Sequence, residues 1–175
     1  YVTSRYRKYI DLYIEKKKFD LDNEEQKNLL QMFNRSGKSH GYLKGVEYKN
    51  SITTISPKNT GIFLGKVIEK KGGHVKLKLE TNINLHDGIE IYNDKNIVST
   101  IVTSIKDNNF KQINSNVEKG NIVYIGDIKQ NVNVNDKIYK TSSSNLNDEI
   151  RNKYLKRCIR RRKIELNIKI KNNET

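Results

Sequence analysis

Alternation of apolar and polar residues dominates this chain between about residues 51 and 141. In the segment His74–Glu80, the side chains of Val75, Leu77 and Leu79 share one face of an extended chain. Successive side chains of a β-strand point to opposite faces, so this pattern predicts a strand with one buried face. The same reasoning predicts five further strands, at Gly61–Ile68, Ile89–Ile91, Ile97–Val102, Asn121–Ile125 and Lys137–Lys140.

Short turn sequences separate the predicted strands. They combine Gly, Asn and Asp, which accept the backbone conformations that tight turns require. The turns lie at Lys71–Gly73, Asp87–Gly88, Asp107–Asn109, Lys119–Gly120 and Asn135–Asp136. No helical pattern lies between the strands, so the connections are too short for parallel crossovers. The sequence therefore predicts an antiparallel barrel or sandwich.

Helical periodicity replaces the alternation before and after this region. The first 18 residues form an amphipathic pattern with a tyrosine-rich apolar side. That side consists of Val2, Tyr6, Tyr9, Ile10, Tyr13 and Ile14. We interpret it as packing on a neighbouring domain or on the barrel, and stacking on nucleic-acid bases is the alternative.

Two more helices are predicted. One spans Asn23–Phe33, where Asp22 caps the first turn and Glu25 completes a capping box. The other begins near Leu146 after a serine-rich link that supplies its N-cap, and it carries an apolar side through Ile159.

The patterns divide the chain into four parts. Residues 1–50 hold the first two helices and a glycine-bearing linker, and residues 51–141 hold the β-barrel. Residues 142–163 form a basic helix, and residues 164–175 form a strand-like tail that we interpret as the start of a further domain. The first residue is Tyr1, inside a helical pattern, so we expect this chain to be a piece of a longer protein.

Composition narrows the class of protein. The 175 residues are 34% hydrophobic and 31% charged, which suits a modest core. No apolar run approaches the length of a membrane span, so no membrane partner is expected. Cys158 is the only cysteine, which excludes an internal disulfide and leads us to expect a cytoplasmic location.

Positive charge is concentrated near the end of the chain. The formal net charge is +14, and five of the eight arginines lie between Arg151 and Arg162. The cluster holds eight cations and no acid: Arg151, Lys153, Lys156, Arg157, Arg160, Arg161, Arg162 and Lys163. Like charges one helical turn apart repel one another, and a phosphate backbone would offset that repulsion. We hypothesise contact with RNA, and a solvated linker to a following domain is the open alternative.

A glycine-bearing stretch, Phe33–Gly45, contains Gly37-Lys38-Ser39, the ending of a phosphate-binding loop. The complete motif needs a glycine where Met32 stands and a strand before the loop, so a nucleotide site is not predicted. We interpret the stretch as the joint between helix and barrel. Its cations Arg35, Lys38 and Lys44 are further candidates for contact with nucleic acid, and an ordinary basic linker is the alternative.

No catalytic constellation is evident in this segment. The three histidines, His40, His74 and His86, show no metal-ligand spacing, and the latter two are predicted to be exposed beside turns. Cys158 is interpreted as a buried apolar residue rather than a nucleophile. We therefore expect no catalytic residue, no metal and no cofactor here.

Four segments occur in this order along the chain: "MFNRSGKSHGYLKG", "SPKNTGIFLGKVIEKKGGHVKLKLE", "LHDGIEI" and "VNVNDKIYKTSS". Together they resemble one bacterial family, the collagenase-like peptidase U-32 family. The resemblance rests most on Phe33-Asn34-Arg35, on Pro57, Asn59 and Gly61, and on the ending Tyr139-Lys140-Thr141. It implies the region that follows the catalytic domain of the longer members. One departure is Lys38, where the family tends to have an aromatic residue.

The resemblance implies a parent protein with an N-terminal catalytic domain as the partner of this segment. Family members are described as peptidases or collagenases, and related members are implicated in RNA hydroxylation. Val98–Ile105 and Lys119–Val123 also resemble the second domain of translation elongation factors. That likeness implies a small antiparallel Greek-key β-barrel, here flanked by two N-terminal helices and one C-terminal basic helix.

Three functions follow as hypotheses. The first is a non-catalytic accessory domain that positions RNA for the parent enzyme. The second is a protein- or collagen-binding module of a peptidase. The third, an intrinsic hydrolase, is not expected because this segment offers no catalytic residues.

Overall fold

Seven antiparallel strands form one sheet in the computed structural model, which describes residues 1–34, 58–93, 96–156 and 165–169. The strand order is β4-β3-β7-β1-β2-β6-β5. The strands are β1 (Ile62–Lys71), β2 (His74–Lys78), β3 (Gly88–Tyr92), β4 (Ile97–Ile101), β5 (Ser104–Lys106), β6 (Ile122–Gly126) and β7 (Lys137–Ser142). Strand β7 therefore lies between β1 and β3, which are far from it in sequence.

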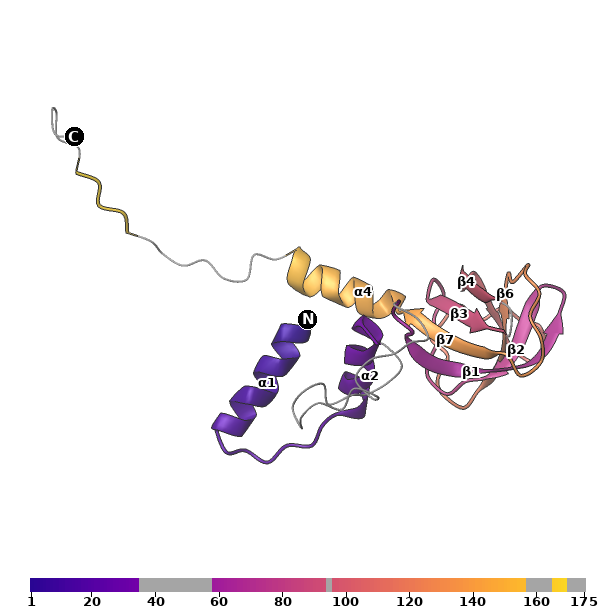
Figure 1. Ribbon diagram of the computed structural model, residues 1–175, viewed down its shortest axis with the longest axis horizontal. Coiled ribbons are helices and arrows are strands. Elements are labelled where there is room, and N and C mark those ends of the chain that lie inside the picture. Colours follow the sequence, from indigo (N-terminus) through magenta and orange to yellow (C-terminus); the bar gives the residue numbers. More distant parts are fainter. Residues whose placement is uncertain (35–57, 94–95, 157–164, 170–175) are drawn as a thin grey trace.

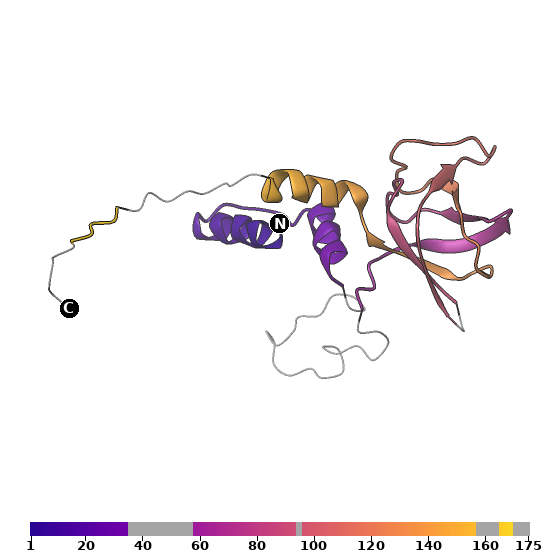
Figure 2. The ribbon, with the colours of Figure 1, turned by 90° about the horizontal axis from the view of Figure 1, so that it is seen from above.

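The two ends of the sheet are joined by a continuous piece of chain. Strands β4 and β5 stand at opposite ends of the strand order, yet only Val102 and Thr103 separate them. The Val102 amide donates to Asp87 O at 2.9 Å, and the Thr103 amide donates to Gly126 O at 3.2 Å. The sheet therefore curls into a barrel-like wall (Figures 1 and 2). The alternation predicted the strand at Ile97–Val102 but not the change of pairing partner that makes β5 a separate strand.

Alternate residues of the strands fill the interior of the curl. Val75 and Leu77 of β2 pack there with Ile89 and Ile91 of β3, as the period-two pattern predicts. The intervening side chains point outward; many are Lys, Ser, Thr or Tyr, and some, such as Phe63, Ile97 and Ile101, are exposed apolar residues. Burial of one face is therefore the force that selects the strand register.

In the part of the chain that the structure describes, three α-helices lie on one side of the barrel (Figures 1 and 2). They are α1 (Val2–Ile14), α2 (Asn23–Met32) and α4 (Ser144–Ile150), and the last continues as a short π-helix, η1 (Arg151–Leu155). The predicted class, mainly β with two N-terminal helices and one C-terminal helix, is confirmed.

The helix caps are partly as predicted. The Asp22 side chain accepts from the Glu24 amide at 2.8 Å, and the Ser143 hydroxyl accepts from the Leu146 amide at 3.4 Å. The capping box is wrong, because the Glu25 carboxylate instead accepts hydrogen bonds from α1, from Arg5 at 2.9 Å and from Lys8 at 2.8 Å. Charged donors bind a carboxylate more strongly than a backbone amide does.

Helix α1 lies on the far side of α2 from the barrel (Figures 1 and 2). Its Tyr9 packs on Phe19, with ring centroids 5.4 Å apart, and donates to Glu25. The rest of the predicted apolar side is exposed, including Tyr6 at 63% and Tyr13 at 77%. Of the two expected partners for this side, the barrel is wrong, since α2 stands between them. A neighbouring domain stays a prediction.

The tail that was predicted to be strand-like is described only at Glu165–Lys169. These five residues are exposed and form no strand. Alternation alone does not stabilise a strand that lacks a neighbour to take its backbone hydrogen bonds.

Candidate functional site

The joint between α2 and the barrel gathers three segments that are distant in sequence. Asn59 lies at its centre. Its Oδ1 accepts from the backbone amides of Asn34 at 2.8 Å and Gly61 at 3.0 Å, and its Nδ2 donates to Thr141 O at 3.2 Å. One side chain thus connects the end of α2, the start of β1 and β7.

A second set of hydrogen bonds closes the same joint. Asn34 Nδ2 donates to Gly61 O at 2.6 Å, and the Thr60 amide donates back to Asn34 O at 2.7 Å. Gly61 has a φ of +65°, and a Cβ there would lie 2.1 Å from Lys140 O. Only glycine fits this position, because any other side chain would strain the backbone and strike β7. The joint predicted at the start of Phe33–Gly45 thus includes Asn34.

Gln31 extends the joint into the interior. Its side chain is 3% exposed, and Nε2 donates to Lys140 O at 2.9 Å. Its Oε1 has no hydrogen-bond donor among the described residues. Buried amide oxygens are normally paired, so a water molecule or a polar ligand group is the expected partner.

Lys140 is the most deeply buried cation in the described part of the chain, at 3% exposed. Its Nζ donates to Asn82 O at 2.9 Å and to Asn82 Oδ1 at 3.1 Å, and it lies 3.7 Å from Asp87 Oδ2. Burial lowers the pKa of Lys140, and the Asp87 carboxylate opposes that shift. These acceptors hold the ammonium in place, so its role is to fix β7 against the loop before β3.

Asp87 is fully buried and connects that loop to α4. Its Oδ2 accepts from the Asn84 amide at 2.9 Å. Its Oδ1 accepts from the Ser144 amide at 2.8 Å and the Ser144 hydroxyl at 2.9 Å. Because Ser144 is the first residue of α4, one carboxylate sets where this helix starts relative to the barrel.

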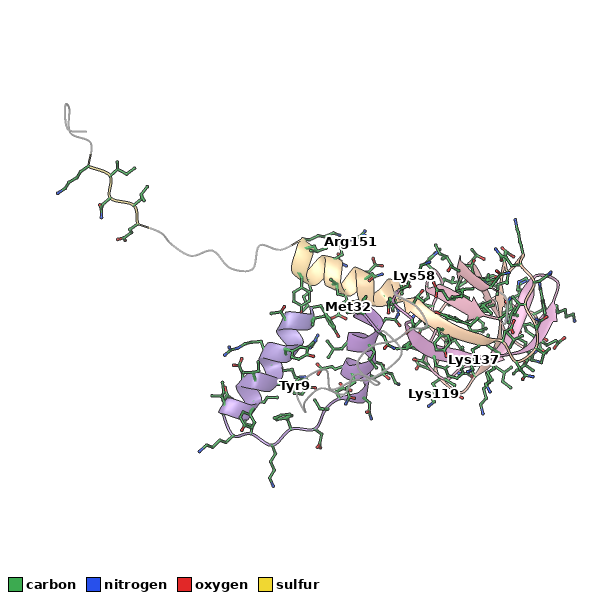
Figure 3. All side chains as sticks on the ribbon, viewed as in Figure 1. Tyr9, Met32, Lys58, Lys119, Lys137 and Arg151 are labelled. Carbon is green, nitrogen blue, oxygen red and sulfur yellow. The ribbon has the colours of Figure 1, made fainter. Side chains whose placement is uncertain are left out.

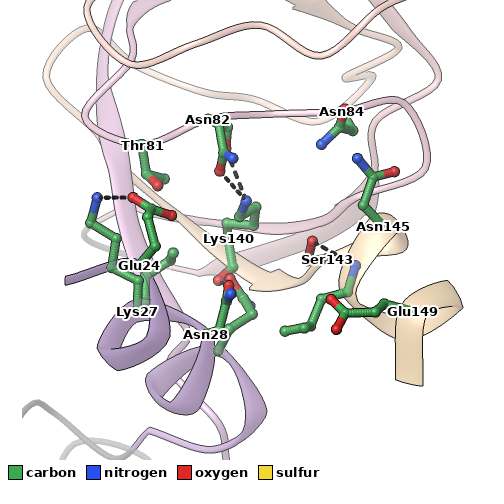
Figure 4. Close-up of a pocket in the computed structure, with 13 residues that line it drawn as sticks. Glu24, Lys27, Asn28, Thr81, Asn82, Asn84, Lys140, Ser143, Asn145 and Glu149 are labelled. Atoms are coloured by element: carbon green, nitrogen blue, oxygen red, sulfur yellow. Dashed lines mark hydrogen bonds and ion pairs between the residues drawn. The ribbon is translucent and has the colours of Figure 1, made fainter. Parts of the chain in front are cut away.

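A polar cavity of about 180 Å³ lies between α2, α4 and the barrel (Figure 4). Lys140 and Asn82 lie on the barrel side, and Asn28 and Glu149 enter from the two helices. The side chains shown offer amides, hydroxyls, carboxylates and ammonium groups, and neither histidine nor cysteine lines this cavity. Such a lining favours water or small polar groups rather than an apolar ligand.

Sequence reasoning missed both Asp87 and Lys140 as buried polar residues. Asp87 was interpreted only as part of a turn. A signal for Lys140 was present, because it follows Ile138 at a spacing of two and so falls on the inward face of β7. A lysine on the inward face of a strand needs a buried partner, although the sequence does not indicate which acid provides it.

Three of the predicted nucleic-acid contacts are described, namely Arg151, Lys153 and Lys156. All three are exposed, and none forms an ion pair within the described part of the chain. Lys153 Nζ lies 5.7 Å from the ring centroid of Tyr154. Arg151 lies toward the end of the C-terminal helix that is farther from the barrel (Figure 3).

The remaining predicted contacts lie outside the described residues. They are Arg35, Lys38, Lys44, Arg157, Arg160, Arg161, Arg162 and Lys163. Cys158 and His40 lie there too.

The two described histidines differ in environment. His86 is exposed, as predicted, but His74 is buried at 8% exposed, which corrects the prediction for that residue. Its ring lies against Phe110 and 3.3 Å from the Ser104 hydroxyl, because β2 places it beside β5 and β6. Within residues 1–34, 58–93, 96–156 and 165–169, no group of His, Cys, Asp or Glu could hold a metal ion. Over the same ranges, no helix is long and apolar enough to cross a membrane.

Comparison with known proteins gives a limited result. No protein-family model matches the sequence, and no curated protein matches it significantly. Among solved structures, the C-terminal domain of a U32 peptidase of Geobacillus thermoleovorans is similar, with 17% identity and a TM-score of 0.42. That similarity covers 49% of this chain and 98% of the other. A selenomethionine variant of the same domain gives 15% identity and a TM-score of 0.41, over 45% and 98% of the two chains. The likeness concerns the backbone and does not extend to an activity.

Proposed function

We propose that this chain is a non-catalytic accessory domain that positions RNA for a catalytic domain of a U-32-type enzyme. The observation that carries the proposal is the joint around Asn59. Five of the residues on which the family resemblance rests, Asn34, Asn59, Gly61, Lys140 and Thr141, meet there in hydrogen bonds between side chains and backbone and in close packing. They hold helix α2 and the barrel together.

A fixed arrangement of helices and barrel suits a domain that presents a surface to a substrate. The surface that we propose for RNA is the exposed stretch formed by η1 and its C-cap, which bears Arg151, Lys153 and Lys156. Their ammonium and guanidinium groups have no carboxylate partner in the described part of the chain. Unpaired cations on one short helical stretch favour a phosphate backbone, because binding releases its counterions.

Charge reversal tests this proposal. In the triple variant Arg151→Glu, Lys153→Glu and Lys156→Glu, we expect RNA affinity to fall by at least about tenfold, since several phosphate contacts are lost. The matched control reverses Lys16, Lys18 and Lys66, which are exposed and lie outside α4 and η1. Fluorescence anisotropy with labelled ribosomal RNA fragments at low salt measures both. Equal affinities of the two triple variants would contradict the proposed surface.

The same samples separate the other two hypotheses. Binding to a collagen or casein peptide that survives high salt would favour a protein-binding module, because the exposed apolar side of α1 offers a surface that is insensitive to salt. Turnover of gelatin or casein by this chain alone would instead establish an intrinsic hydrolase, and we expect none.

A further inference from the structure

The outer wall of the barrel carries a compact group of three lysines and two aromatic rings. The rings of Phe110 and Tyr124 lie with centroids 4.5 Å apart. The Nζ atoms of Lys71 and Lys106 each lie 5.2 Å from the Phe110 centroid, and that of Lys76 lies 5.2 Å from the Tyr124 centroid. We call these five residues the lysine–aromatic face.

Strand register builds this face. Tyr124 of β6 is paired with Lys76 of β2 on one side and with Lys106 of β5 on the other. Directly opposed residues share a face of the sheet, so both lysines are placed beside the same ring. Their neighbours Leu77 and Ile105 point into the core. Register therefore places Lys76, Lys106 and Tyr124 side by side over the core.

A strained turn brings the second ring to the face. Phe110 has a φ of +62°, which is unusual for a bulky residue. The Phe110 amide donates to Asp107 O at 3.0 Å, and the Asp107 carboxylate accepts from the amides of Asn109 at 2.8 Å and Lys111 at 2.9 Å. Strain of this kind persists when surrounding contacts enforce it, and it occurs often at ligand-binding positions.

The electrostatics of the face are unbalanced. None of Lys71, Lys76 and Lys106 forms an ion pair within the described part of the chain. Two carboxylates lie close by: Glu69 is paired with Lys76 across β1 and β2 and accepts from the Tyr124 hydroxyl at 3.1 Å, and Asp107 accepts from the amides of its own turn. The three ammonium groups outnumber these carboxylates, so an anion would reduce the repulsion that remains among them.

We propose that the lysine–aromatic face binds single-stranded RNA. A base would stack on Phe110 while the lysines pair with the adjoining phosphates. Aromatic rings interleaved with cations are the usual means of holding a single strand, because every base has a face to stack and every nucleotide has a phosphate. A polyacid such as polyglutamate would pair with the lysines but has no ring to stack on Phe110. The choice of RNA rests on the proposed function, whereas the surface does not overlap Arg151, Lys153 or Lys156.

A single substitution supplies a direct reporter. The chain has no tryptophan, so Phe110→Trp introduces one fluorophore at the face. Titration with a 12-nucleotide oligouridine should quench it by stacking. Inorganic polyphosphate should bind with little quenching, and polyglutamate should bind more weakly than the oligouridine. Polyphosphate binding without any quenching by oligouridine would overturn stacking at Phe110. Equal or tighter binding of polyglutamate would assign the face to an acidic protein.

Charge variants separate this proposal from that for the helix. In the native Phe110 background, Lys76→Glu with Lys106→Glu should weaken oligouridine binding by at least about tenfold. The control Lys66→Glu with Lys137→Glu reverses two exposed lysines that are paired across β1 and β7. It should change the affinity for oligouridine by less than about threefold. Unfolding midpoints should show that each variant is folded.

Three patterns of result are informative. Loss of binding in the Lys76 and Lys106 variant alone supports RNA binding by the lysine–aromatic face and contradicts RNA binding by Arg151, Lys153 and Lys156. Loss only in the Arg151, Lys153 and Lys156 variant overturns this face and leaves the proposed function intact. No binding of oligouridine or ribosomal RNA by the native chain overturns both.

Discussion

Asn59 Oδ1 lies 2.8 Å from the amide nitrogen of Asn34. A side chain just before β1 therefore binds the backbone just after α2. The same side chain reaches Thr141 O on β7 through its Nδ2. The end of α2 and the barrel are therefore both bonded to one side-chain amide, which helps to orient α2 on the barrel.

Removal of this amide should loosen the joint. In Asn59→Ala, the amides of Asn34 and Gly61 lose their acceptor, and we expect the free energy of unfolding to fall by about 2–3 kcal/mol, since each hydrogen bond contributes about 0.5–1.5 kcal/mol. Asn59→Asp keeps the acceptor oxygen, so the free energy of unfolding should fall by less than in Asn59→Ala. Urea unfolding followed by circular dichroism measures both. A loss below about 0.5 kcal/mol for Asn59→Ala would show that the joint does not depend on this residue.

Gly61 provides a steric test with a matched control. Gly61→Ala places a Cβ at 2.1 Å from Lys140 O, whereas Gly72, at a φ of +53°, has open space around it. Both substitutions carry the cost of a left-handed backbone, about 1–2 kcal/mol. Gly61→Ala should cost about 1–3 kcal/mol more because of overpacking. Equal unfolding midpoints for the two variants would contradict close packing of Gly61 on β7.

The buried Lys140 predicts a pH dependence of defined sign. Burial lowers its pKa in the folded state below the ordinary value of 10.5, so the unfolded chain binds this proton more tightly. The contribution of Lys140 to the free energy of unfolding should therefore rise with pH up to the ordinary pKa of 10.5. The difference in unfolding free energy between the native chain and Lys140→Met should grow in favour of the native chain from pH 8 to pH 10. A decrease over that window would mean that the ion pair with Asp87 outweighs burial.

Docking of α1 on α2 should depend on Glu25. Hydrogen bonds from Lys8 and Tyr9 lower the pKa of its carboxyl, and the charge of Arg5 adds to the effect. Because the pKa of Glu25 is lower in the folded state, its contribution to stability is fully present above the ordinary pKa of 4.5. That contribution is lost as the pH falls through the folded-state pKa. Glu25→Gln should increase hydrogen exchange in α1 at pH 7 but leave β2 unchanged. Unchanged exchange in α1 would show that other contacts hold it.

Much of the barrel could be predicted from the sequence because period-two burial is a local signal. Val75 and Leu77 reveal their strand without any knowledge of its neighbours. The partners across the sheet could not be predicted in the same way. Lys140 and Asp87 are 53 positions apart, and only the placement of β7 beside β3 brings them together.

The surfaces were harder to predict than the core. Lys71, Lys76, Lys106, Phe110 and Tyr124 come from four strands and a turn, and their grouping depends on strand order and on the positive φ of Phe110. The exposure of Tyr6 and Tyr13 had a different cause. An amphipathic pattern states that one face is apolar but does not state what covers it.

The salt dependence of RNA binding tests the central claim most directly. The 175-residue chain is titrated into a labelled single-stranded RNA, and fluorescence anisotropy measures the binding constant K between about 50 and 200 mM salt. In that range, about five phosphate contacts give a slope of log K against log salt near −3.5. The account predicts binding at low salt with a slope of about −2 to −4, since single strands contribute about −0.7 per phosphate. Absence of binding at 50 mM salt, or binding with a slope near zero, would contradict it.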